Sequence, residues 1–139
     1  MNPLSDTENR IPGNIVFIRV PDDMAREIGS FTVDPAIMLP VELGEGGLDL
    51  SGLGWEMIVA GMLRLLAHNP GHEAADYYRR FVLAVKPGIF AELSETGILK
   101  ARNGDRDVAE EIFLALSGLA PDAPEPILNL AILNEDRAD

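Results

Sequence analysis

The sequence contains no cysteine. Disulfide bonds, thiolate catalysis and every metal or iron–sulfur site built on cysteine are therefore excluded. A reducing cytoplasm is the simplest compartment for such a chain. The remaining composition is that of a globular protein, because 47% of the 139 residues are apolar, which is enough to build the core of one domain.

Basic residues are also scarce. The chain has 11 Lys and Arg against 23 Asp and Glu, for a net charge of −12. The excess is even, because residues 1–69 carry 10 acids and 4 bases, and residues 70–139 carry 13 acids and 7 bases. Without a basic patch to neutralise phosphates, we expect no nucleic-acid partner. An anionic membrane surface would also repel the chain, so the charge serves either solubility alone or attraction to a basic partner.

No apolar run is long enough for a membrane helix. Residues 57–66 come closest, but this stretch is short and contains Arg64. Residues 1–10 are polar and lack the charged-then-apolar order of a signal peptide. We therefore expect neither a membrane span nor a secretory leader.

Residues 1–54 have the composition of an arm with two short extended segments. Residues 14–20 (NIVFIRV) are rich in β-branched side chains and stop before a proline, which predicts a strand. Residues 31–43 contain a second extended run, in which Pro35 and Pro40 favour an edge strand or an irregular chain. Strands this short do not form a stable sheet alone. They must pair with each other against the helix that follows, or with another chain.

Two further parts of the arm carry local signals. Residues 22–28 are compatible with one or two helical turns, with Asp22 as the cap. Residues 44–54 (GEGGLDLSGLG) are rich in glycine and predict a hinge between two differently built halves.

After the hinge, the apolar residues recur with helical periodicity, and turns with Asn, Gly or Pro interrupt them. Short turns place consecutive helices as antiparallel neighbours. Asp105 is well placed to cap the fourth helix. The five predicted helices span Trp55–His68, 73–85, 89–101, 105–119 and 123–133.

The helical half repeats at a spacing of 34 residues. The matched pairs are Pro87 and Pro121, Ala75 and Ala109, Leu93 and Ile127, and Gly97 and Ala131. A 34-residue unit of two helices resembles the tetratricopeptide repeat (TPR). The best-matched segment is 103–131, in which Ala109 and Phe113 give the small-then-aromatic pair one turn apart. Small residues let the helices approach closely, and the prolines fix where each pair turns.

The resemblance covers residues 55–139, about two and a half repeats, and it has departures. Leu93 and Ile127 replace the tryptophan of the family, and Arg79 stands at the first unit's equivalent of Phe113. Lys100 and Asn134 replace the aromatic residue expected later in the first helix. The resemblance implies a mostly α fold, in which antiparallel helix pairs stack as a short right-handed superhelix beside a small N-terminal β segment. A plain bundle of helical hairpins is the alternative.

The third unit stops after its first helix. Leu128, Leu130, Ile132 and Leu133 would leave an apolar face there, whereas repeat arrays normally end in a polar-faced cap. Either the chain is a fragment of a longer array, or this helix is itself the cap, or another chain completes it. Self-association would bury the face.

Sequence signals for chemistry are weak. His68 and His72 are four residues apart, but Pro70-Gly71 lies between them, so they do not share a helical face. Residues 44–54 lack the lysine of a phosphate loop. Nothing in the sequence singles out a nucleophile with its base or an acid/base pair. We therefore expect no catalytic residue, no metal site, no cofactor and no enzymatic activity.

The resemblance implies a concave groove lined by the first helix of each pair. Two hypotheses follow: a non-enzymatic module that binds a protein or peptide in the groove, or a structural module that forms homo-oligomers through the last helix and the N-terminal strands. Arg64 and Arg102 could meet a peptide carboxylate, or could pair with acids of the chain itself. The groove residues implied by the resemblance are Arg64, His68, Ser94, Ile98, Arg102, Leu128 and Ile132.

Overall fold

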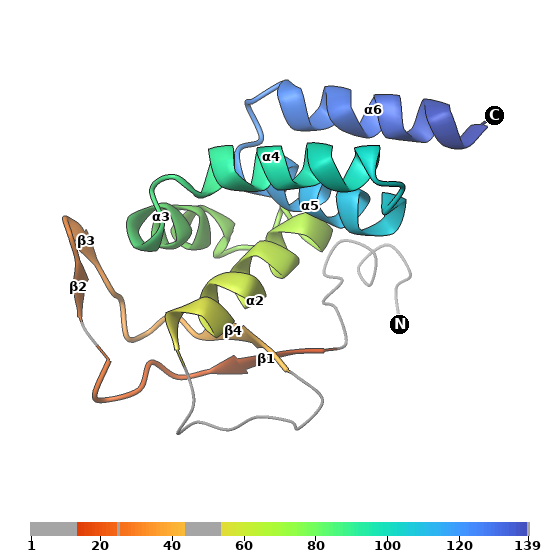
Figure 1. Ribbon diagram of the computed structural model, residues 1–139. Coiled ribbons are helices and arrows are strands. Elements are labelled where there is room, and N and C mark those ends of the chain that lie inside the picture. Colours follow the sequence, from red (N-terminus) through yellow and green to blue (C-terminus); the bar gives the residue numbers. More distant parts are fainter. Residues whose placement is uncertain (1–13, 25, 44–53, 139) are drawn as a thin grey trace.

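The computed structural model of the chain describes residues 14–24, 26–43 and 54–138, with side chains as far as residue 135. Its short strands are β1 (Ile15–Ile18), β2 (Glu27–Ile28), β3 (Phe31–Thr32) and β4 (Leu39–Glu42). Its helices are α2 (Trp55–His68), α3 (Ala75–Val85), α4 (Ile89–Arg102), α5 (Arg106–Leu119) and α6 (Glu125–Ala138). The described part is therefore mostly helical, with two small antiparallel strand pairs (Figure 1).

The two main extended segments pair with each other and cover one side of α2. β1 and β4 are antiparallel, with Ile15 opposite Glu42 and Ile18 opposite Leu39. The side chains of Leu39 and Val41 are fully buried, and β4 packs directly on α2. Because the sheet has only two strands, both are edges, and β4 can include Pro40 without losing a ladder partner on its outer side.

Helix α2 occupies the predicted residues and is buried between two neighbours, β4 and α5. The backbones of β4 and α5 approach the backbone of α2 most closely at two glycines. A Cβ atom on Gly61 would lie 2.7 Å from the carbonyl carbon of Pro40 in β4, and one on Gly118 of α5 would lie 2.5 Å from the carbonyl carbon of Leu66. Real Cβ atoms do not approach backbone so closely, so only glycine fits at either position.

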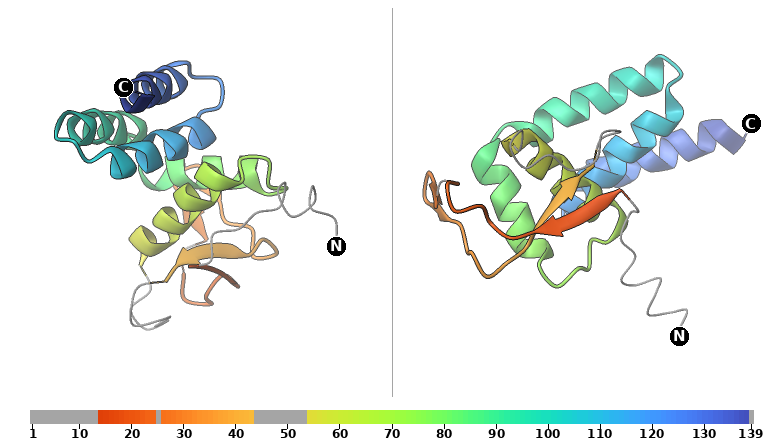
Figure 2. Two further views of the ribbon diagram at one scale, coloured as in Figure 1. Left: turned by 90° about the vertical axis from the view of Figure 1, so that its right-hand side faces the viewer. Right: turned by 90° about the horizontal axis from the view of Figure 1, so that it is seen from below.

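The buried apolar side chains form two clusters. The first joins the strands, α2 and α3, and includes Leu119 from the end of α5. The second lies among α4, α5 and α6 and consists of Ala109, Phe113, Leu116 and Leu133. Figure 2 shows these three helices together on the side of α2 away from the strands. Helix α5 therefore joins the two parts of the molecule, and both predicted halves of the chain contribute to the first cluster.

The helical turns predicted for residues 22–28 are not found in the described part of that stretch. The amide of Met24 donates to the carbonyl of Pro21 in a single turn, and Glu27–Ile28 pairs with Phe31–Thr32 as a hairpin. Gly29 has φ +60°, which a two-residue hairpin loop requires. The turn at Gly29 and Ser30 therefore determines the local structure as a hairpin, and Asp22 does not begin a helix there.

Consecutive helices are not all antiparallel neighbours. Helix α4 packs along α5, and α5 packs along α6, as the short turns predict. Helix α3, however, has little contact with α4. Its buried stripe, which includes Tyr77, Tyr78 and Phe81, packs instead on the N-terminal segment and α2. The prediction that α3 and α4 pack side by side is wrong, because a short turn limits only the distance between the helix ends. It does not determine whether the apolar face of α3 packs on α4 or on another surface.

Two smaller predictions have partial outcomes. Asp105 is the residue before α5, but its side chain makes no capping hydrogen bond, and a carboxylate oxygen lies 3.8 Å from Lys100 Nζ instead. The glycine-rich hinge lies outside the described residues except for Gly54, as does the leader before Asn14.

Replacing Gly118 with alanine tests the close approach of α5 to α2. In an open helix this change stabilises by up to about 1 kcal/mol, but overpacking against a backbone costs about 1–3 kcal/mol or more. We expect Gly118→Ala to lower the free energy of unfolding by about 1–2 kcal/mol. Urea denaturation followed by the fluorescence of Trp55, the only tryptophan, measures it.

Gly88→Ala is the matched control, because a Cβ atom there meets nothing within 4 Å and φ is −91°. It should change the free energy by less than about 0.5 kcal/mol. A Gly118→Ala protein as stable as the wild type would contradict the close packing.

Candidate functional site

A hollow of about 250 Å³ lies between α4 and α6, the two helices seen side by side in Figure 1. Three of the residues predicted for a groove line it: Ile98, Arg102 and Ile132. Ile98 and Ile132 are apolar yet 38% and 57% exposed. The full lining is Ile98, Ala101, Arg102, Phe113, Asn129, Ile132 and Leu133. It is therefore an apolar hollow with a guanidinium beside it.

The contact between Gly97 and Phe113 sets the base of this hollow. A Cβ atom on Gly97 would lie 2.6 Å from Cε1 of Phe113, so the ring of Phe113 lies directly against the backbone of α4. Phe113 is buried, as is Leu133 across from it on α6. The sequence pairs Phe113 with Ala109, one turn earlier on α5, and both are buried in the same cluster, but the close contact between α4 and α5 is made by Gly97 and Phe113.

The two predicted groove residues of α2 lie elsewhere and face acids of the same chain. The Nε atom of Arg64 is 4.0 Å from Oε2 of Glu42 in β4. The Nε2 atom of His68 is 2.8 Å and 3.1 Å from the two carboxylate oxygens of Glu111 in α5. The Arg64 contact matches the alternative of intramolecular pairing that the sequence leaves open for Arg64 and Arg102, whereas the His68 contact was not predicted. Both contacts follow from α2 packing on β4 and α5.

The other two predicted residues do not line the hollow. Ser94 is half-buried on α4, and Leu128 is 59% exposed on α6. Of the seven predicted residues, the structure therefore brings together Ile98, Arg102 and Ile132. Arg64 and His68 lie on α2. Ser94 and Leu128 lie one turn before Ile98 and Ile132 on the same helices, outside the lining.

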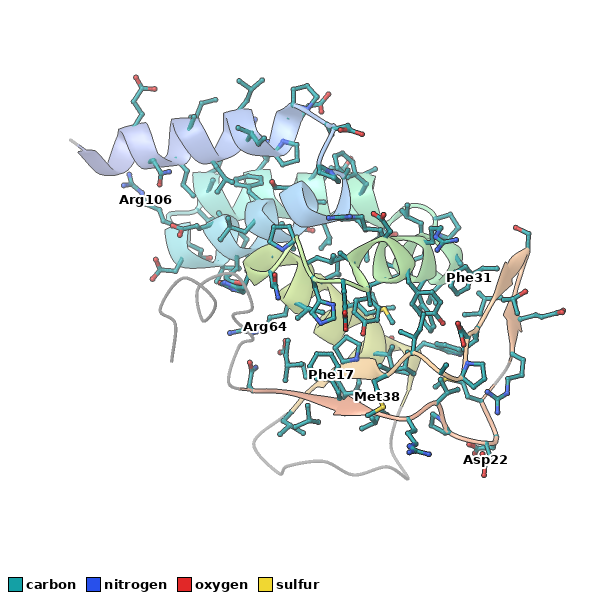
Figure 3. The ribbon with its side chains drawn as sticks, turned by 180° about the vertical axis from the view of Figure 1, so that it is seen from behind. Phe17, Asp22, Phe31, Met38, Arg64 and Arg106 are labelled. Atoms are coloured by element: carbon teal, nitrogen blue, oxygen red, sulfur yellow. The ribbon has the colours of Figure 1, made fainter. Side chains whose placement is uncertain are left out.

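A second and larger hollow, of about 600 Å³, was not predicted. It lies between β1, the chain just before β4, and the first turn of α3. Its lining is Phe17, Ala36, Ile37, Met38, His72, Glu73, Ala74, Asp76, Tyr77, Tyr78 and Arg80. Figure 3, which views the molecule from behind, labels Phe17 and Met38. Three separate stretches of sequence form this hollow, so no local motif could predict it.

The two tyrosines of this hollow are fixed by hydrogen bonds to the N-terminal segment. The hydroxyl of Tyr78 donates to the carbonyl of Met38 at 2.7 Å, and the hydroxyl of Tyr77 accepts from the amide of Asp34 at 2.9 Å. Burial raises the pKa of both phenols, and that of Tyr78 reaches about 12. Both therefore remain neutral hydrogen-bonding groups at physiological pH.

Arg79 accounts for one departure from the repeat. Its guanidinium donates to the carbonyl of Gly118 at 2.7 Å and to the carbonyl of Pro70 at 2.8 Å, and it pairs with Asp76 at 2.7 Å. The Gly118 carbonyl is in the last turn of α5, where helix carbonyls lack partners. An arginine at this position thus ties α3 to the end of α5, which an aromatic residue could not do.

No protein-family model matches the chain, and no curated protein or solved structure does so either. Within the described residues, no three His, Asp or Glu side chains gather as a metal would need. In the same residues, none of the helices combines the length and apolar character of a membrane span.

The two tyrosines, which are the only ones in the chain, provide a pH test of the second hollow. In the folded protein, absorbance at 295 nm should show the pKa of Tyr77 raised above the ordinary value of 10, and Tyr78 should titrate near pH 12. Because the folded state holds the proton more tightly than the unfolded state, stability is full below pH 10. It falls as the pH rises from 10 to 12.

Tyr78→Phe should flatten this fall and also cost about 1 kcal/mol through the lost bond to Met38. A full two-tyrosine step at pH 10 in the folded wild type would show that the phenols are not held as described.

Proposed function

We propose that this chain is a non-enzymatic protein-interaction module of the TPR type, which binds a peptide segment of a partner protein in the hollow between α4 and α6. The observation that carries the proposal is the coincidence of that hollow with the residues implied by the resemblance. The resemblance to the repeat implies Ile98, Arg102 and Ile132 as groove residues, and these three line one apolar hollow that is open to solvent.

The packing order supports the repeat reading of residues 89–138. Helix α4 pairs with α5, and α6 packs on α5 and also touches α4. In the repeat, α4 and α6 are equivalent first helices and α5 is the second helix between them. Gly97 and Ala131 are the equivalent small residues of α4 and α6, and Phe113 lies between the helices.

The size and charge of the hollow favour a peptide. At about 250 Å³ it is smaller than the pockets of about 300–1,000 Å³ that enclose drug-sized ligands, but it has room for an apolar side chain. Arg102 is exposed and makes no ion pair with any side chain that the structure describes. In a chain of net charge −12, this cation next to an apolar hollow suits a peptide that carries a carboxylate beside an apolar residue.

Two neighbouring residues of α4 give a matched test. A random peptide library displayed on phage is selected on the wild type, and the tightest peptide is measured by calorimetry. Ile98→Asp should weaken its binding by about tenfold or more, because an apolar contact inside an interface is replaced by a charge.

Leu99→Asp makes the same chemical change at a residue that is 55% exposed but does not line the hollow. It should change the affinity by less than about twofold. Equal losses in both variants would contradict binding in the hollow, as would a library that yields no binder.

The exposed apolar face of α6 favours one alternative, self-assembly into a homo-oligomer. Ile127, Leu128 and Ile132 are 55%, 59% and 57% exposed, and a second copy could bury them. Burial of each such side chain contributes about 1.5–3 kcal/mol. Light scattering on the wild type and on Leu128→Asp separates the two functions.

A wild type that is monomeric at high concentration would remove the assembly function. A dimer that the substitution converts to a monomer would favour assembly over the groove. Leu83→Asp, at an exposed leucine of α3 (41% exposed), is the control and should leave the mass unchanged.

A further inference from the structure

The second hollow, between β1, the chain before β4 and the start of α3, has a continuous aromatic wall. The rings of Phe17 and His72 stack at 6.0 Å with an angle of 14° between their planes. His72 is 5.8 Å from Tyr78, and Tyr78 is 6.0 Å from Tyr77. Four ring systems from two distant segments thus line one side of an open hollow of about 600 Å³.

The wall is held rigidly. Tyr78 is bonded to the carbonyl of Met38, and Tyr77 to the amide of Asp34, so neither ring can swing away without breaking a hydrogen bond. His72 accepts a hydrogen bond from the amide of Ala74 at its Nδ1 atom, which leaves Nε2 to carry the proton of the neutral ring. A preformed wall of this kind lowers the entropy lost when a ligand binds.

The rest of the lining carries two acids, Glu73 and Asp76, and one base, Arg80. Both acids are exposed. The basic side chains close to them are partly engaged: Arg79 pairs with Asp76, and the Nε atom of Arg80 donates to the backbone carbonyl of Asp76 at 3.5 Å. Glu73 has no hydrogen bond or ion pair with any described residue. Its carboxylate is therefore available at the edge of the aromatic wall.

Aromatic faces with an adjacent carboxylate are the surroundings that an organic cation prefers, since the ring faces and the acid both carry negative potential. An anion would be repelled by Glu73, whereas Asp76 is already paired with Arg79 and Arg80 is the one basic side chain of the lining. A metal ion would need several converging acids or histidines, and no such group occurs among the described residues. The net charge of −12 adds a long-range attraction for cations.

We propose that this hollow binds a lysine or arginine side chain from a basic segment of a partner protein. It would be a second contact site, separate from the hollow between α4 and α6, with the opposite charge preference. The hollow is larger than one side chain, so backbone of the partner would lie in it as well. The ammonium or guanidinium group would face the rings of Phe17 and His72 and pair with Glu73.

Nitrogen-15 NMR with short peptides tests the proposal on the whole chain. The probe is acetyl-Ala-Lys-Ala-Arg-amide, and the comparison is the same peptide with norleucine in place of both basic residues. At low ionic strength, the basic peptide should shift the amide signals of 36–38 and 72–80 in a saturable manner. The norleucine peptide should bind at least about fivefold more weakly.

Glu73→Gln and Glu95→Gln form a matched pair, because both glutamates are exposed and both changes raise the net charge by one. Glu95 lies on α4, outside the hollow. We expect Glu73→Gln to weaken the basic peptide about threefold to tenfold, and Glu95→Gln less than about 1.5-fold. Phe17→Leu should weaken it as well, while both hydrogen bonds of the tyrosines remain.

Three results would overturn the site. Equal losses in the two glutamine variants would show diffuse attraction to an acidic surface. Equal binding of the norleucine peptide would show an apolar hollow with no preference for charge. Shifts confined to residues outside 36–38 and 72–80, or no saturable shift at millimolar peptide, would show that the hollow is not a cation site.

Discussion

The structure depends on the close approach of three backbones at α2. Gly61 lets the carbonyl of Pro40 in β4 touch the helix, and Gly118 lets α5 touch the carbonyl of Leu66. Each contact removes the space that a single methyl group would need, in accord with the close packing of protein interiors. Because β4 and α5 are both held at backbone distance from α2, the strands and the distal helices are fixed relative to each other (Figure 1).

The two hollows follow from this arrangement. Helix α2 packs on β4 and α5, and the apolar stripe of α3 packs on α2 and on the N-terminal segment, where Tyr77 and Tyr78 bond to Asp34 and Met38. This packing forms the second hollow, between β1, the chain before β4 and the start of α3. On the other side, α5 presents Phe113 to α4 and α6, and Gly97 lets its ring lie against α4. This produces the apolar hollow.

Local structure was largely predictable, because it depends on the periodicity of apolar residues and on the Asn, Gly and Pro residues that end helices. The bounds of α2 match the prediction, and those of α3 to α6 differ mainly at their ends, where capping decides. Ala109 and Phe113, one turn apart on α5, are both buried in the cluster among α4, α5 and α6. The hairpin at Gly29 was not predicted. Asp22 could cap a helix, and this favoured helical turns over a two-residue turn at Gly29 and Ser30.

Long-range packing was not predictable from the same signals. His68 and Glu111 are 43 residues apart, as are Asp34 and Tyr77, and neither pair has a local pattern. The role of Arg79 could be noticed only as a departure from the repeat. Helix α3 could have packed on α4 or on the N-terminal segment. The shapes of both surfaces determine which of the two it contacts. Sequence periodicity contains no such information.

We propose that this chain meets a partner at the apolar hollow between α4 and α6. Amide hydrogen exchange of the chain, with and without the tightest peptide from the display library, locates the contact directly. We expect added protection in 94–102 and 126–134, with little change in α2. Protection confined to other parts of the chain, with 94–102 and 126–134 unchanged at saturation, would contradict it.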